Sequence, residues 1–293
     1  MRSFLFVPGD SEKKLDKSRT SGADTLLIDL EDSISPERKA VARATTIAFL
    51  KDFGQAIGRP RLFVRVNGLA TGLTDADLAV MEGRPDGIVL PKAEGGAALV
   101  HLDAKLGVAE ARHDIPDGQT RILALTTETA KSLFLAGTYA GATARLMGLT
   151  WGGEDLSVAL GAEANRGEDG RFLDPYRLAR SLCLAAAAAC EVQALDTVYI
   201  DFRNTDGLRR EAEEARRDGF TGKMAIHPGQ VEIINAVFTP TSDAIARAKA
   251  VVAAFAAEPA AGVVGIDGVM YDRPHLARAQ QLLARAEAAG AKA

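Results

Sequence analysis

The chain has 293 residues, of which 47% are hydrophobic and 25% are charged. These proportions are those of an ordinary globular protein and exclude a disordered chain or a small disulfide-bonded scaffold. Lys and Arg number 35 and Asp and Glu number 39, so the net charge is −4 and no basic excess exists. Because nucleic-acid and anionic-membrane binding need a basic surface, we expect neither partner and predict a small-molecule ligand.

The sequence gives no sign of a membrane span or an export signal. Its longest notable uncharged apolar stretch, residues 181–190, is far shorter than the ~18 residues that a spanning helix needs. The only two cysteines, Cys183 and Cys190, lie about 10 Å apart along one Ala-rich helical stretch. That separation exceeds the ~7 Å limit for a disulfide. We therefore expect reduced cysteines and a cytoplasmic protein.

Short apolar runs alternate with helical segments through most of the chain. Runs such as TLLIDL and GIVL are almost wholly apolar, which is typical of parallel strands covered on both faces. The predicted strands are 4–7, 25–30, 62–66, 87–90, 121–126, 146–151, 197–200 and 223–226. Eight strand–helix units in about 235 residues match the count and size of a (β/α)8 TIM barrel. An open doubly wound sheet is the main alternative, because strand counting alone does not separate the two.

The pattern changes after residue 238. A predicted helix at 243–258 precedes two short strands, 263–266 and 269–271, and the turn pair Asp267–Gly268 between them indicates a hairpin. A final helix begins at Asp272 and extends to about residue 288. We predict a catalytic barrel at 1–238 and a small α/β domain at 239–293.

Charged and polar residues follow nearly every predicted strand. In a TIM barrel the carboxyl ends of the strands meet at one rim, and catalytic groups gather there. The residues at these ends are Asp10, Asp29, Glu31, Asp32, Arg65, Asn67, Lys92, Glu94, Glu128, Glu154, Asp155, Asp201, Arg203 and His227. Chance would scatter such groups over both ends, so we expect a site at this rim.

Carboxylates dominate this rim, without cysteine or paired histidine. Glu128 and Asp155, which follow adjacent predicted strands, could share one hard cation, and oxygen-only ligation favours Mg2+ over zinc or copper. The alternative is that Glu128 caps the helix that starts in TTETAKS, and we favour the metal role. Glu154 is explained at least as well as a loop carboxylate.

Arg65 ends an otherwise apolar strand, so its guanidinium needs an anionic partner. That partner is an internal carboxylate, such as Asp29 or Glu31, or a substrate oxygen, and both can hold at once. Lys92 could form a Schiff base, but a salt bridge or a phosphate contact explains it better. We interpret His227 as structural. The chain contains no nucleophile elbow, Walker A loop or G-x-G-x-x-G motif.

The motifs at the strand ends resemble those of a known family. In chain order they are FVPGDSEKK, LIDLEDSI, VRVN, LPKAE, LTTETAKS, GGEDLS, KMAIHPGQV and DGVMYDRPHL. Together they resemble the citrate lyase β-subunit-like family, which includes malyl-CoA and citramalyl-CoA lyases, over essentially the whole chain. The resemblance implies a TIM barrel with a C-terminal lid, usually assembled as a homotrimer or a higher multiple of it. It also implies an enzyme that cleaves or forms a carbon–carbon bond between a 2-oxo acid and an acetyl thioester.

The resemblance also implies roles for single residues. Glu128 and Asp155 would bind Mg2+, and Arg65 would bind the oxygen of the oxo acid. The lid of one subunit would close over the neighbouring barrel and bring Asp272 as an acid/base group, although sequence alone favours a helix N-cap there. We include Glu31 and Asp32, from LIDLEDSI, among the expected catalytic residues. The CoA phosphates are expected near Lys13, Lys14, Lys17, Arg19 and Lys92.

Three functions remain open at this point. The first is a free-standing Mg2+-dependent lyase that converts citramalyl-CoA or malyl-CoA to acetyl-CoA and pyruvate or glyoxylate. The second is a thioesterase that releases CoA from a malyl-type thioester. The third is a citrate lyase β subunit that acts on a carrier-bound thioester. We favour the lyase.

Overall fold

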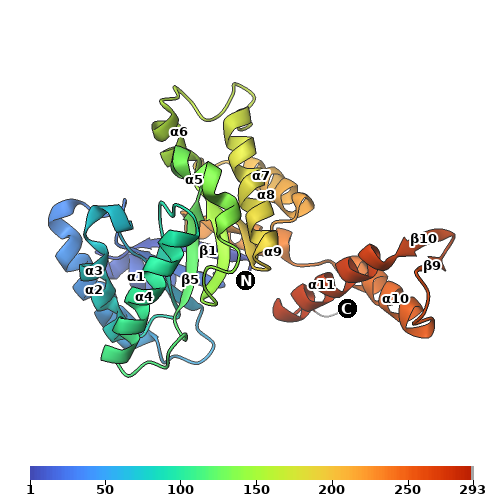
Figure 1. Ribbon diagram of the computed structural model, residues 1–293, viewed down its shortest axis with the longest axis horizontal. Coiled ribbons are helices and arrows are strands. Elements are labelled where there is room, and N and C mark those ends of the chain that lie inside the picture. Colours follow the sequence, from blue (N-terminus) through green and yellow to red (C-terminus); the bar gives the residue numbers. More distant parts are fainter. Residues whose placement is uncertain (292–293) are drawn as a thin grey trace.

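A computed structural model describes residues 1–291 and contains a closed barrel of eight parallel strands (Figure 1). Each strand pairs with the next in sequence, and β1 closes the barrel against β8. The strands are β1 (Ser3–Pro8), β2 (Thr25–Asp29), β3 (Arg61–Arg65), β4 (Gly87–Leu90), β5 (Arg121–Thr126), β6 (Leu146–Trp151), β7 (Gln193–Asp196) and β8 (Gly222–Ala225). The predicted (β/α)8 barrel is confirmed, and the open sheet is excluded.

Helices cover the outside of the barrel. They are α1 (Glu12–Ser18), α2 (Lys39–Phe53), α3 (Thr74–Asp77), α4 (Gly96–Arg112), α5 (Ala130–Leu135), α6 (Gly153–Leu160), α7 (Asp174–Ala189), α8 (Thr205–Asp218) and α9 (Val231–Phe238). Short 3-10 turns are η1 (Pro36–Arg38), η2 (Leu69–Thr71), η3 (Leu78–Gly83), η4 (Ala136–Thr138) and η5 (Pro228–Gln230).

The apolar side chains of the strands contribute to two hydrophobic cores, one inside the barrel and one between the barrel and its helices. Because successive side chains of a strand point to opposite faces, Leu26 and Ile28 of β2 pack outward against the helices, whereas Leu27 packs inside the barrel. The same alternation directs Asp29, the last residue of β2, toward the barrel axis at the rim. The strand pattern therefore also positions polar groups of the site.

One predicted strand is wrong. The seventh strand is Gln193–Asp196, not 197–200, because β6 pairs with it at Gly148↔Gln193 and Thr150↔Leu195. The β-branched run at 197–200 lies just beyond the carboxyl end of this strand. There the side chain of Gln230 donates a hydrogen bond to the Tyr199 carbonyl oxygen (2.8 Å). Residues 197–200 therefore form a loop at the rim, although their β-propensity is high.

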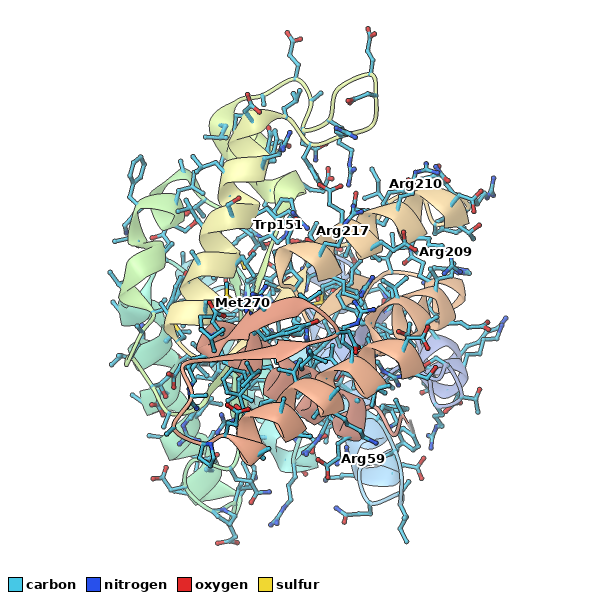
Figure 2. The ribbon with its side chains drawn as sticks, turned by 90° about the vertical axis from the view of Figure 1, so that its right-hand side faces the viewer. Arg59, Trp151, Arg209, Arg210, Arg217 and Met270 are labelled. Carbon is cyan, nitrogen blue, oxygen red and sulfur yellow. The ribbon has the colours of Figure 1, made fainter. Side chains whose placement is uncertain are left out.

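A buried ion network lies between β7, β8 and the outer helices. Lys223 of β8 is fully buried, and its Nζ lies 2.8 Å from Asp196 Oδ2 and 2.9 Å from Glu211 Oε1. Asp196 Oδ1 also accepts from Trp151 Nε1 (2.8 Å) and Arg180 Nε (3.1 Å). Figure 2 shows Trp151 above the C-terminal hairpin in that view. Every charge in this network has an opposite partner, as burial requires.

The C-terminal part forms a separate packed unit that projects from the barrel (Figure 1). It consists of α10 (Ser242–Ala257), β9 (Val263–Ile266), β10 (Val269–Asp272) and α11 (Arg273–Ala288). Asp267 and Gly268, at φ 51° and 77°, form the tight turn of the predicted hairpin. The unit has its own core around Val251, Phe255 and Val264. Residues 292–293, the end of the predicted second domain, lie outside the described residues.

Two smaller expectations can be compared with the structure of residues 1–291. Cys183 and Cys190 are both free there, and burial raises the pKa of the Cys183 thiol to about 12. Within the same range, no helix is both long enough and apolar enough to cross a membrane.

Candidate active site

Arg65 and Asp29 form a buried pair at the barrel rim. They end adjacent strands in register, and Arg65 Nε and Nη2 donate to the two carboxylate oxygens of Asp29 at 2.7 and 2.8 Å. Burial alone would lower the pKa of Arg65, but the hydrogen bond and charge of Asp29 raise it above its usual range. The internal pairing that we weighed for Arg65 is therefore present. Since a guanidinium has five N–H groups and Asp29 accepts two, three remain for other acceptors.

Glu31 and Asp32 lie beside this pair in the loop after β2. Glu31 is buried, with Oε2 3.0 Å from Arg65 Nη1, whereas Asp32 is half exposed and lies 3.8 Å from the same nitrogen. Burial raises the pKa of Glu31, and the nearby charges of Arg65 and Lys92 oppose that effect. The structure therefore brings both predicted carboxylates to the rim.

Lys92 follows β4 and reaches into the same group of carboxylates. Its Nζ lies 2.6 Å from Glu31 Oε1, 3.3 Å from Asp155 Oδ1 and 3.6 Å from Asp32 Oδ2. These contacts are those of the salt bridge that we weighed against a Schiff base. The Lys92 ammonium, which we expected near the CoA phosphates, thus bridges three carboxylates in this structure.

Glu128 is buried directly after β5 and does not cap a helix. The residue that caps α5 is Thr129, which forms a capping box with Ser132. Glu128 Oε2 instead accepts the backbone N–H of Lys92 at 2.5 Å. Burial, helped by the charges of Asp155 and Glu31 and opposed by the Lys92 N–H, raises the pKa of Glu128 to about 8.

Two features around Glu128 escaped the sequence analysis. Thr127 has φ 58°, a left-handed conformation that is strained for a β-branched residue. Gly152, which follows β6, leaves the space that the Glu128 side chain fills, because a Cβ there would lie 2.8 Å from Glu128 Cγ and 2.9 Å from Oε1. The only signal for this was the Gly–Gly pair after Trp151, which sequence alone does not distinguish from a turn.

Asp155 completes what we call the carboxylate cluster, namely Glu31, Asp32, Glu128 and Asp155. It lies in the first turn of α6 with its side chain 35% exposed, so it faces the rim and solvent. The neighbouring Glu154 accepts from Asn165 Nδ2 (2.7 Å), which agrees with the interpretation of a loop carboxylate.

The donor set of the carboxylate cluster fits a hard, hydrated cation. Among residues 1–291, no group of three or more His, Cys, Asp and Glu side chains is placed to hold an ion. A site that offers only Glu128 and Asp155 would leave most positions to water, which suits Mg2+ and not a structural zinc. The buried Glu128 carboxyl, whose pKa is raised, needs a cation to be ionised at neutral pH.

Lys39 is a further residue that sequence reasoning missed. Its Nζ donates to the carbonyl oxygens of Leu30 and Glu31, both at 2.7 Å, and to Asn67 Oδ1 at 2.8 Å. It thereby fixes the loop that carries Glu31 against the end of β3. As the first residue of a long helix, it carries no motif that could have revealed this role.

The structure does not bring Arg19 to the rim. Arg19 follows the last residue of α1, and its Nη2 pairs with Asp52 near the end of α2 at 2.6 Å. Its guanidinium also stacks on Phe49 and Phe53, at 5.0 and 4.9 Å from the ring centroids. Because helices of a TIM barrel run opposite to the strands, these helix ends lie at the other end of the barrel. Lys13 and Lys14, in contrast, are exposed in the first turn of α1, next to the rim.

Asp272 lies on the C-terminal unit, away from the carboxylate cluster of its own chain (Figure 1). It is the N-cap of α11, where it accepts the His275 N–H at 3.3 Å and contacts the His275 ring. The side-chain hydrogen bond with the His275 ring, helped by the backbone N–H, lowers the pKa of Asp272. His227, the other histidine that we considered, caps η5 through Nδ1 and stacks on Phe202, as a structural residue would.

Comparison with known proteins identifies the relatives of this site. Residues 2–228 match the family model described as HpcH/HpaI aldolase/citrate lyase. The chain belongs to the HpcH/HpaI aldolase/citrate lyase family. This result confirms the resemblance that the strand-end motifs carry.

Individual members of the family align over nearly the whole chain. A (3S)-malyl-CoA thioesterase of Cereibacter sphaeroides is 38% identical, with 99% of this chain and 96% of the relative covered. Mitochondrial citramalyl-CoA lyase of Rattus norvegicus is 33% identical, with 96% and 85% covered. The crystal structure of Mycobacterium tuberculosis CitE with magnesium, acetoacetate and coenzyme A superposes with a TM-score of 0.78 at 32% identity, covering 98% of both chains.

Proposed function

We propose that this protein is a Mg2+-dependent carbon–carbon lyase. It would cleave or form a 3-hydroxyacyl-CoA such as citramalyl-CoA or malyl-CoA, with acetyl-CoA and pyruvate or glyoxylate as the partners. The observation that carries the proposal is the placement of Arg65, whose side chain is only 11% exposed, beside a carboxylate cluster that holds a buried Glu128. The citramalyl-CoA lyase among its relatives supports the reaction, and the CitE complex supports the ligands.

Glu128 and Asp155 would hold the metal ion. When bound, Mg2+ supplies a Lewis acid for the oxygens of the 2-oxo or 2-hydroxy acid. Arg65 would donate to the same oxygen from its free N–H groups, while its bidentate bond to Asp29 holds the guanidinium plane in place. Glu31 and Asp32 would orient Arg65 and Lys92 from the opposite side.

Proton transfer would come from Asp272 of a second copy of the chain. In the condensation direction its carboxylate accepts a proton from the thioester methyl carbon, the enolate attacks the carbonyl carbon of the oxo acid, and the resulting alkoxide takes up a proton from solvent. In cleavage the same group returns the proton to the enolate carbon. The hydrogen bond with His275, which lowers the pKa of Asp272, supports the base form at neutral pH.

The exposed C-terminal unit supports an assembly in which it covers a neighbouring barrel. Its hairpin carries exposed apolar side chains, among them Met270 at 70% and Val269 at 54% exposure, and Figure 2 shows Met270 on this face. We propose a homotrimer with 1–238 as the barrel and 239–293 as the lid. Lys13 and Lys14, in the first turn of α1, remain the proposed phosphate contacts of CoA, whereas Lys17 lies in the last turn beside Arg19. The cytoplasmic location remains a prediction from the sequence.

A methyl group at Gly152 should damage the metal site selectively. In Gly152→Ala the new Cβ would collide with Glu128 Cγ and Oε1, and the carboxyl group would have to move. We expect Mg2+ affinity and turnover to fall about 10- to 100-fold, the range for misplaced metal ligands. Gly137→Ala is the matched control, because its Cβ would meet no atom within 4 Å in the described part of the chain. Equal losses in both variants would contradict the argument.

Mg2+ binding should release a proton from Glu128. Since burial raises the pKa of Glu128 to about 8, the carboxyl group is mainly protonated at neutral pH without metal. The ion binds the ionised form, so its apparent affinity should rise with pH up to about 8 and then level off. Calorimetry in buffers of different ionisation enthalpy should detect nearly one proton released near pH 6 and almost none near pH 9. A pH-independent affinity over this range would show that Glu128 is not the titrating ligand.

Product analysis by mass spectrometry tests the proposed reaction. The purified protein with Mg2+ would receive malyl-CoA and both enantiomers of citramalyl-CoA, with EDTA as the control. Acetyl-CoA together with glyoxylate or pyruvate, lost on chelation, is the expected result. Intact 3-hydroxy acid and free CoA would instead assign a thioesterase, the second candidate, which the 38% identical relative favours.

Failure on all free CoA thioesters would reject both of these activities. It would favour a citrate lyase β subunit, the third candidate, whose substrate is tethered to a carrier protein. The family description, which includes citrate lyase, is the observation behind this candidate. A citryl thioester on an acyl carrier protein is then the substrate to test.

A further inference from the structure

Lys92 contacts both residues of the proposed metal pair. Its backbone N–H donates to Glu128 Oε2 at 2.5 Å, and its Nζ lies 3.3 Å from Asp155 Oδ1. Among residues 1–291, it is the one cation that forms a salt bridge with Asp155. The same Nζ lies 2.6 Å from Glu31 Oε1, so the ammonium joins the two sides of the carboxylate cluster.

The backbone of Lys92 is arranged for this double contact. Its φ of 50° lies in the left-handed region, which is costly for a residue with a Cβ and is typical of functional sites. The next residue, Ala93, anchors the turn to β5 by donating to the Leu125 carbonyl oxygen at 3.0 Å. Because of this turn, one residue presents its N–H to Glu128 and its ammonium to Asp155.

The position of the ammonium conflicts with a metal ion on Asp155. A divalent ion bound to the Asp155 carboxylate would lie about 5 Å from an ammonium that is within salt-bridge distance of the same carboxylate. The two cations would repel each other. The Lys92 side chain is 33% exposed, so its ammonium can turn toward the open mouth of the barrel. An anionic substrate that enters there would meet the Lys92 ammonium, which would no longer be paired with Asp155.

We infer that Lys92 competes with Mg2+ for Asp155 and makes Mg2+ and an anionic oxo acid bind cooperatively. The Lys92 ammonium would leave Asp155 when that carboxylate holds the ion, and it would then bind the carboxylate of the arriving acid. Lys92 therefore weakens metal binding alone and strengthens it when substrate is present. This inference rests on the proposed function, because it takes Glu128 and Asp155 as the metal ligands.

Direct binding of Mn2+, a hard cation that stands in for Mg2+, tests the inference without an activity assay. Free Mn2+ is measured by electron paramagnetic resonance in titrations of the full-length protein, with and without pyruvate. Without pyruvate, Lys92→Met should bind Mn2+ about tenfold more tightly than the wild type, because one repelling charge is gone. Pyruvate should raise the Mn2+ affinity of the wild type about fivefold or more and that of Lys92→Met much less.

Lys92→Arg is the matched control, since it keeps the charge and should keep weak, pyruvate-dependent Mn2+ binding. Equal Mn2+ affinity in the wild type and a folded Lys92→Met, checked by circular dichroism, would overturn the inference. So would an arginine variant that behaves like the methionine variant. A wild type whose Mn2+ binding is absent, or survives Glu128→Gln unchanged, would instead overturn the proposed metal site.

Discussion

Replacing Glu128 with Gln is expected to reduce metal-dependent turnover about a thousandfold or more, because the amide retains the shape of the carboxyl group but loses the charge that binds the ion. Glu128 is 3% exposed and lies against the Lys92 N–H, so the substitution is nearly isosteric and should leave the fold intact. Turnover should be measured at saturating Mg2+ by the same product analysis, together with Mn2+ binding.

The neighbouring carboxylate Glu154 provides the control for this experiment. Glu154→Gln removes the same charge two peptide units from Gly152 but alters an exposed side chain that bonds to Asn165. We expect its turnover to stay within about threefold of the wild type, as for most surface substitutions. Metal-dependent turnover that persists in Glu128→Gln would mean that the site has been assigned to the wrong carboxylate.

Lys223→Met is expected to produce the largest loss of stability in the barrel. It would leave Asp196, which is 1% exposed, and Glu211 without the ammonium that lies 2.8 and 2.9 Å from their oxygens. Breaking a buried ion pair by removing one partner costs about 3–5 kcal/mol. Because Arg180 still pairs with Asp196 and Arg166 with Glu211, we expect a loss near the lower end of that range. The free energy of unfolding in urea measures this effect.

Lys51→Met is the control for the lysine side chain itself. Lys51 pairs with Glu82 at 2.5 Å, but both side chains are about half exposed. An exposed pair of this kind contributes about 1 kcal/mol or less. If Lys223→Met lowered the free energy of unfolding by no more than Lys51→Met does, then Arg180 and Trp151 would be sufficient to stabilise Asp196.

The sequence allowed the barrel to be predicted because its strands have a strong local signal. TLLIDL divides its leucine and isoleucine side chains between two cores, which gives a nearly continuous apolar run that periodicity analysis detects. The seventh strand was misplaced because its own sequence, QALD, has little β-propensity. It is a strand because β6 and β8 pair with it, and such pairing is not visible in a local pattern.

A rim residue could be predicted from the sequence where it lies at the end of a correctly predicted strand. Asp29 and Arg65 end strands whose position was correct, Glu128 follows such a strand, and the structure brings all three to one rim. The engagement of Lys92 with Asp155 could not be predicted, because it depends on a left-handed turn and on a contact between residues 63 positions apart. Arg19 was misassigned because the sequence does not show that one end of α1 faces the rim and the other end faces away.

The projecting C-terminal unit has a consequence for how copies of this protein can associate. The hairpin and the barrel mouth are different surfaces, so a contact between them is head-to-tail and leaves the pair of copies with one free hairpin and one free mouth. Such a contact either closes into a ring or continues as a filament, depending on the rotation between successive copies. The bend between α9 and α10, at Pro240, sets the direction of the projecting unit and hence that rotation. A change of a few degrees there would alter the number of subunits without touching either surface.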